Sequence, residues 1–143
     1  MIRNDSERLI LEDMCARLPY NPKVSFYLFT IGKSKQTILR SINPTDETYH
    51  IGNQNYDDFS RIKPYLRSLS NMTADEKKTW SCIVNGPDSD DIFDHIMLSR
   101  INVESMGKAI DFLNSHYFDY RGLIEKDLAI EAPEGMYLLS RDE

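Results

Sequence analysis

The stretch KVSFYLFTI, residues 23–31, decides the fold expected of this chain. It is rich in β-branched and aromatic residues and too short for a buried helix, so it is expected to form a strand. Apolar side chains occupy both alternating sets of positions, namely Val24, Phe26 and Leu28 on one face and Tyr27, Phe29 and Ile31 on the other. The sequence therefore predicts a strand that is buried on both faces.

Further strands are predicted downstream of this one. A turn separates it from residues 36–42, which are expected to pair back on it as a hairpin. Residues 48–51 form a third short strand. Residues 62–66 form a fourth at a sheet edge, where the missing backbone donor of Pro64 is tolerated. These segments predict an antiparallel meander of three or four strands, with closure into a small barrel as an alternative.

A helix is predicted before the strands. Residues 5–17 have helical periodicity, Asp5 or Ser6 is placed to cap the segment, and Pro19 ends it. Its apolar face consists of Ile10, Leu11, Met14 and Leu18.

About three helices are predicted after the strands. Thr73 and Glu76 have the spacing of a capping box, which begins a helix to about residue 83. A second helix follows the acidic residues 88–91, whose charge suits a helix amino end. The third begins after Asn102, and its expected buried stripe is Val103, Met106, Ile110, Leu113 and Tyr117.

The chain as a whole is expected to be a single α+β domain over residues 1–143. A length of 143 residues is about that of one domain. Between residues 119 and 143 only 128–130 suggest a short strand or turn, and the path of the rest stays open.

The acidic composition argues against two classes of binding partner. The net charge of −6 and the pI near 5.1 argue against non-specific binding to nucleic acid or an anionic membrane. The only dense basic segment is 61–67. The net negative charge favours a protein or a small molecule as the partner, and a protein partner is expected. The amino terminus lacks the apolar stretch of a secretory signal, and no later stretch reaches membrane-spanning length, so a cytoplasmic location is expected.

Signatures of cofactors and catalysis are weak. There is no phosphate-binding glycine loop or dinucleotide fingerprint, and the two cysteines are 67 positions apart, so no cofactor is expected. The best metal-like arrangement is Asp91, Asp94 and His95, where Asp91 and His95 are one helical turn apart. The alternative interpretation is that these acidic residues stabilise a helix start without an ion.

A cluster at residues 117–124 is the most unusual local feature. Tyrosine and arginine, which dominate protein-binding hot spots, occur here with an acid and a glycine. The candidate protein-binding residues are Phe118, Asp119, Tyr120 and Arg121, joined by Tyr65 and Arg67. The alternative is a helix stop whose aromatic side chains fold back into the core.

Several short blocks carry a resemblance. They are EDMCARLPY at 12–20, IKPYLR at 62–67 with SNMT at 70–73, FDYRGLI at 118–124 and EAPEGMY at 131–137. Together they resemble an uncharacterised group of short proteins encoded in gut-bacterial genomes and their prophages. The resemblance implies a mobile-element accessory context and favours binding over catalysis, but it brings no activity, ligand or catalytic residue.

Three functional hypotheses follow. The first is a small non-catalytic interaction protein that binds through the 117–124 cluster. The second is a small metal-dependent enzyme built around Asp91, Asp94 and His95. The third is a weak nucleic-acid-binding module that uses the meander and the basic segment 61–67.

Overall fold

The computed structural model describes residues 2–85 and 103–137. The helices are α1 (Asp5–Arg17), α2 (Ala74–Asn85) and α4 (Val103–Ser115), with short 3-10 turns at Leu18–Tyr20, Phe59–Arg61 and Leu69–Asn71. The strands are β1 (Lys23–Leu28), β2 (Lys33–Ile38), β3 (Ser41–Asn43), β4 (Thr48–Ile51), β5 (Gln54–Tyr56), β6 (Ile62–Leu66) and β7 (Ile130–Glu131). The α+β class, with an N-terminal helix, antiparallel strands and later helices, is confirmed.

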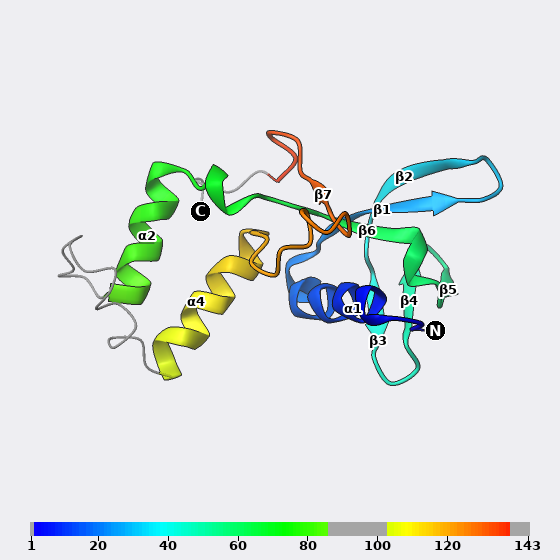
Figure 1. The fold of residues 1–143 in the computed structure, drawn as a ribbon, viewed down its shortest axis with the longest axis horizontal. Coiled ribbons are helices and arrows are strands. Elements are labelled where there is room, and N and C mark those ends of the chain that lie inside the picture. The colour runs from blue at the N-terminus through cyan, green and yellow to red at the C-terminus, as the bar shows by residue number, and fades with distance from the viewer. Residues whose placement is uncertain (1, 86–102, 138–143) are drawn as a thin grey trace.

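The elements are arranged along the long axis of the molecule. The α2 and α4 helices lie side by side at one end, the strands gather at the other, and α1 lies between them (Figure 1). The β1–β2 hairpin projects furthest from the helical end.

The strands form two sheets rather than the expected single meander. The first has the order β2-β1-β6-β7 and the second the order β3-β4-β5, and neither closes into a barrel. The chain crosses between them at two residues: Leu39 donates to the carbonyl of Pro22, and Arg40 donates to the carbonyl of His50 in the other sheet. Leu39 is 2% exposed and belongs to the hydrophobic core, so its side chain is buried where the chain passes from one sheet to the other.

The strand β6 has the predicted bounds but lies inside its sheet. It pairs antiparallel with β1, where Val24 faces Pro64, and parallel with β7. The parallel pairing covers only Tyr65 and Leu66, so Pro64 needs no donor toward β7. The expected edge position is therefore wrong for β6 as a whole. It is correct at Pro64, which pairs with β1 on one side and with no strand on the other.

The first helix matches its predicted bounds. Its cap is Asn4 rather than Asp5 or Ser6, because the Asn4 side chain accepts a hydrogen bond of 2.8 Å from the backbone N–H of Glu7. The predicted apolar face is buried at Ile10, Leu11 and Met14, while Leu18 is half-buried.

The two later helices confirm one prediction and correct another. Thr73 and Glu76 form the capping box, with reciprocal hydrogen bonds of 2.8 and 3.1 Å. In α4, however, Met106 and Ile110 are exposed, while Ala109, Phe112 and Leu113 are buried. The helix expected after residues 88–91 lies outside the described residues.

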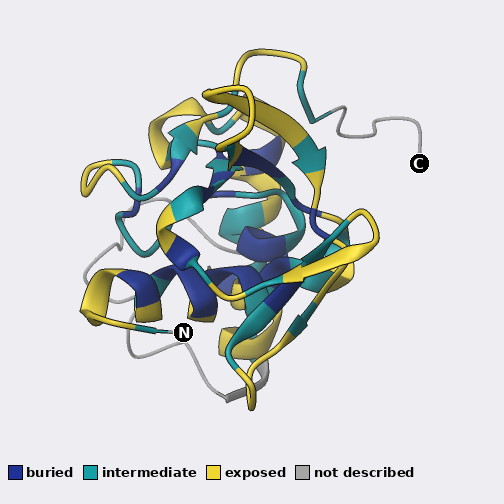
Figure 2. Cartoon of the chain, turned by 90° about the vertical axis from the view of Figure 1, so that its right-hand side faces the viewer, coloured by how far each residue is buried: buried dark blue, intermediate teal, exposed yellow. Residues whose placement is uncertain are grey.

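Buried side chains gather in three clusters. The largest lies between α1 and the two sheets. A second, around Phe112 and Phe118, lies between α2 and α4. A small one, around Leu66 and Leu123, lies beside β6. Figure 2 shows buried residues on α1 and the inner strands and exposed residues at the periphery. No helix in the described part of the chain is long and apolar enough to span a membrane.

Candidate functional site

The six candidate binding residues lie where the helical end meets the sheets. Phe118 is fully buried, and Tyr65, Arg67, Asp119, Tyr120 and Arg121 are half-buried. A bridge between Arg67 and Phe118 joins β6 to the segment after α4. Binding of a partner through these residues stays a prediction.

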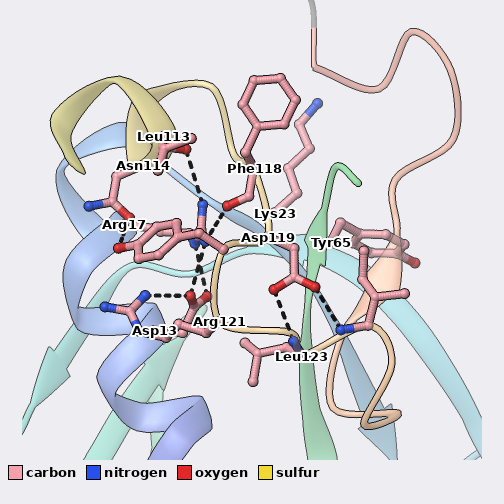
Figure 3. A network of polar contacts seen from close by, with 12 residues as sticks. Asp13, Arg17, Lys23, Tyr65, Leu113, Asn114, Phe118, Asp119, Arg121 and Leu123 are labelled. Atoms are coloured by element: carbon pink, nitrogen blue, oxygen red, sulfur yellow. Dashed lines mark hydrogen bonds and ion pairs between the residues drawn. The ribbon is translucent and has the colours of Figure 1, made fainter. Parts of the chain in front are cut away.

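Arg121 belongs to a buried ionic network with Asp13 and Arg17 of α1, here called the Asp13 network. Arg17 binds both oxygens of Asp13, through Nε at 2.9 Å and Nη2 at 3.0 Å, and both side chains are 0% exposed. Arg121 donates to Asp13 Oδ1 at 2.7 Å. Figure 3 shows the carboxylate between the two guanidinium groups.

Arg17 also ties α1 to the end of α4. Its guanidinium donates to the backbone carbonyl of Phe118 at 2.6 Å and to that of Leu113 at 3.4 Å. The segment needs such anchors because Tyr117 has a left-handed φ of 63°, a conformation that costs a non-glycine residue energy. The Tyr117 ring stacks on Tyr137 with centroids 3.7 Å apart, which helps to hold it.

Arg67 links the end of β6 to the start of α2. It binds Glu76 through two hydrogen bonds of 2.7 and 2.8 Å, and its guanidinium lies 4.2 Å from the centre of the Phe118 ring. Burial alone would raise the pKa of Glu76, but hydrogen bonds from Arg67 and from the backbone N–H of Thr73 hold that pKa below its ordinary value.

The Glu76→Gln variant is expected to lose about 1–3 kcal/mol of unfolding free energy at neutral pH, because it removes a charge-assisted pair. A lowered pKa in the folded state stabilises the fold above the ordinary carboxyl pKa, and this contribution is lost as the pH falls through the lowered value. The difference between variant and wild type should therefore shrink below about pH 4.3. Urea denaturation across pH measures it, with the exposed Glu125→Gln as control; a pH-independent difference would contradict the pKa argument.

Asp119 and Tyr120 also make their hydrogen bonds within the chain. The two oxygens of Asp119 accept hydrogen bonds of 2.9 Å each from the backbone N–H groups of Leu123 and Ile124. The hydroxyl of Tyr120 donates to the buried Asn114 at 2.8 Å. These contacts are those of a helix stop folded onto the core, the alternative that the sequence left open.

The basic segment 61–67 is also engaged within the molecule. Arg61 donates to the backbone carbonyl of Tyr27 at 2.8 and 3.0 Å, and Lys63 lies 3.2 Å from a carboxylate oxygen of Asp127. Because Arg67 is paired with Glu76, each cation has an acceptor in its own chain. The carboxylates of Asp127 and Glu76 offset the charges of Lys63 and Arg67, which lowers the positive charge that these two residues present to phosphate groups.

The metal candidates Asp91, Asp94 and His95 lie outside the described residues. Among residues 2–85 and 103–137, no group of three His, Cys, Asp or Glu side chains is placed to hold a metal ion.

Two shallow grooves lie on the second sheet. Their volumes are about 340 and 460 Å³, and both are lined by Thr48 and Asn55. His50 Nδ1 lies 2.7 Å from Asn55 Oδ1 in the larger groove, and both side chains are at least partly exposed. The larger groove is also lined by the buried Tyr49, but its hydroxyl is engaged, because it donates to the backbone carbonyl of Asp58 at 2.7 Å.

The β1–β2 hairpin is a surface that the sequence prediction missed. Tyr27, Phe29 and Ile31, here called the hairpin tip, are 37%, 65% and 61% exposed. The expected burial on both faces is therefore wrong for the outer half of this stretch, because β6 pairs with β1 only from Val24 to Phe26. Ile38, at the other end of β2, is 48% exposed.

The hairpin tip is held in place by Arg61 and by contacts between its own rings. The guanidinium of Arg61 lies 4.3 Å from the centre of the Phe29 ring and 4.5 Å from that of Phe26. The rings of Tyr27 and Phe29 meet edge to face with centroids 5.3 Å apart. Gly32 closes the loop with a φ of 64°, a conformation that glycine adopts without strain.

Comparison of the chain with protein-family models, with curated proteins and with solved structures gives no match.

Proposed function

We propose that this chain is a non-catalytic interaction protein that binds a protein partner through the β1–β2 hairpin. The observation that carries the proposal is the exposure of Phe29 and Ile31 at 65% and 61% on a loop, where polar residues are usual. Of the seven exposed large apolar side chains among the described residues, four lie on this one hairpin: Tyr27, Phe29, Ile31 and Ile38.

The residue types and their rigidity support binding of a protein. Tyrosine and arginine are enriched at the centres of protein interfaces. Arg61 is already fixed by its hydrogen bonds to Tyr27 and by its contact with Phe29, so less conformational entropy is lost when a partner binds.

The test is capture of partners by the tagged protein from nuclease-treated extract of the source organism, read by mass spectrometry. The hairpin variant carries Phe29→Ala with Ile31→Ala. The matched control carries Met106→Ala with Ile110→Ala on α4, which removes two side chains that are also exposed, by 56% and 42%. We expect the hairpin variant alone to lose a partner that the wild type retains, with its melting temperature within about 3 °C of wild type.

Two results would overturn this proposal. One is a set of captured proteins that the hairpin variant retains in full. The other is equal loss in both variants, because that pattern reports general hydrophobic adhesion rather than a site on the hairpin.

A further inference from the structure

The outer edge of β2 is open. Within the described residues β2 pairs only with β1, and it ends the strand order of its sheet. Five of its six residues are exposed and Thr37 is half-buried. An unpaired strand edge presents a row of backbone donors and acceptors to which another extended chain can add as a further strand.

The hairpin is basic although the protein is acidic. The sequence has no Asp or Glu between Asp13 and Asp46, whereas the whole chain carries a net charge of −6. Lys33, Lys35 and Arg40 lie in this interval and are exposed. An approaching chain that follows β2 therefore meets local positive charge.

The register divides the β2 side chains between two faces. Residues paired across antiparallel strands share a face. Lys33 is opposite Leu28 and Lys35 is opposite Phe26, so both lysines lie on the same face of the hairpin. Ser34 is opposite Tyr27, which places Ser34, Gln36 and Ile38 on the other face.

We propose that the β2 edge binds an extended segment of the partner protein in which carboxylates alternate with apolar residues. The carboxylates of the bound segment then lie on the same face as Lys33 and Lys35, and its apolar residues lie on the same face as Tyr27 and Ile38. This inference rests on the proposed function and specifies the chemistry of the partner.

A second copy of the chain fits this edge less well. Where the lysine faces of two β2 strands lie on the same side of the joined sheet, Lys33 and Lys35 of the two copies come together, and like charges across strands are destabilising. The same lysines that oppose self-association, a common protection of sheet edges, favour an acidic strand.

Single-stranded nucleic acid also fits less well. Arg61 covers one face of the Phe29 ring, which reduces the surface on which a base can stack. The carboxylates of Asp57 and Asp58 line a groove together with Arg61 and repel phosphate groups there.

The test measures the binding of fluorescently labelled peptides to the full chain by anisotropy. The probe is a peptide of about eight residues that alternates Asp and Val, a length that spans β2. The controls are a peptide of the same composition with the Asp residues in one block, the alternating peptide N-methylated at alternate backbone nitrogens, and an oligothymidylate. The variant Lys33→Glu with Lys35→Glu is tested against the same peptides and against one that alternates Lys and Val.

We expect the alternating acidic peptide to bind at least about tenfold more tightly than either control. The block peptide cannot place all its carboxylates on the lysine face, and the N-methylated peptide lacks backbone donors. The charge-reversed variant should prefer the Lys–Val peptide. Three results would each overturn the inference: a block or N-methylated peptide that binds as tightly as the alternating acidic peptide, an oligothymidylate that binds more tightly than that peptide, or concentration-dependent dimerisation without peptide binding.

The two proposals fail differently. If capture from extract depends on Phe29 and Ile31 but no acidic peptide binds, the edge-pairing inference is wrong and the proposed function stands. If capture is independent of the hairpin tip, the proposed function itself is wrong, whatever the peptides do.

Discussion

Replacement of Asp13 by alanine is expected to lower the free energy of unfolding by about 3–5 kcal/mol. The variant leaves the guanidinium of Arg17 fully buried without a counter-ion and beside that of Arg121, which donates to the same carboxylate. Bringing two like charges together in a poorly solvated site costs more than the loss of either hydrogen bond.

Urea denaturation followed by circular dichroism measures this effect. The control is Glu12→Ala, an exposed carboxylate next to Asp13 on the same helix, which should change stability by no more than about 0.5 kcal/mol. The double variant Asp13→Ala with Arg17→Met should recover part of the loss because it removes the buried charge. Recovery stays partial, since the carbonyl of Phe118 then loses its donor. An Asp13→Ala variant as stable as Glu12→Ala would show that the network contributes little.

The local elements were predictable because short-range physics decides them. The periodicity and the proline that define α1, the turns that bound β4 and the capping box of α2 all lie within a few residues of the elements they determine. The structure reproduces the predicted bounds of α1, β4 and β6 for that reason.

The exposed face of α4 was not predictable from its stripe. The apolar residues of this helix form one broad face, and both Met106 with Ile110 and Ala109 with Phe112 lie within it at helical spacing. Packing against Trp80 of α2 and against Phe118 selects the second stripe, and Trp80 lies far away in the sequence.

The same limit applies to the candidate sites. Asp13 and Arg17 have the spacing of an ordinary surface pair, and only Arg121, 108 positions away from Asp13, makes them a network. The hairpin did leave a signal in the sequence. The absence of carboxylates between Asp13 and Asp46, with Phe29 and Ile31 beside a glycine turn, indicates an exposed basic and apolar hairpin.

The Phe118→Ala variant is expected to lose about 3–5 kcal/mol of unfolding free energy. Its ring is 0% exposed and lies between Phe112 and the guanidinium of Arg67, so alanine leaves a cavity where α4 meets β6. The cavity also removes packing from Arg67, which holds the amino end of α2 through Glu76.

Denaturation followed by the fluorescence of Trp80, which packs in the same cluster, measures this loss. The matched control is Phe29→Ala, which removes the same side chain from a site that is 65% exposed and should cost less than about 1 kcal/mol. Equal stability of the two variants would show that the Phe118 ring does not hold the helical end to the sheets. If the predicted contrast is found, loss of binding by a Phe118 variant reports unfolding, whereas loss of binding by a Phe29 variant reports loss of a contact.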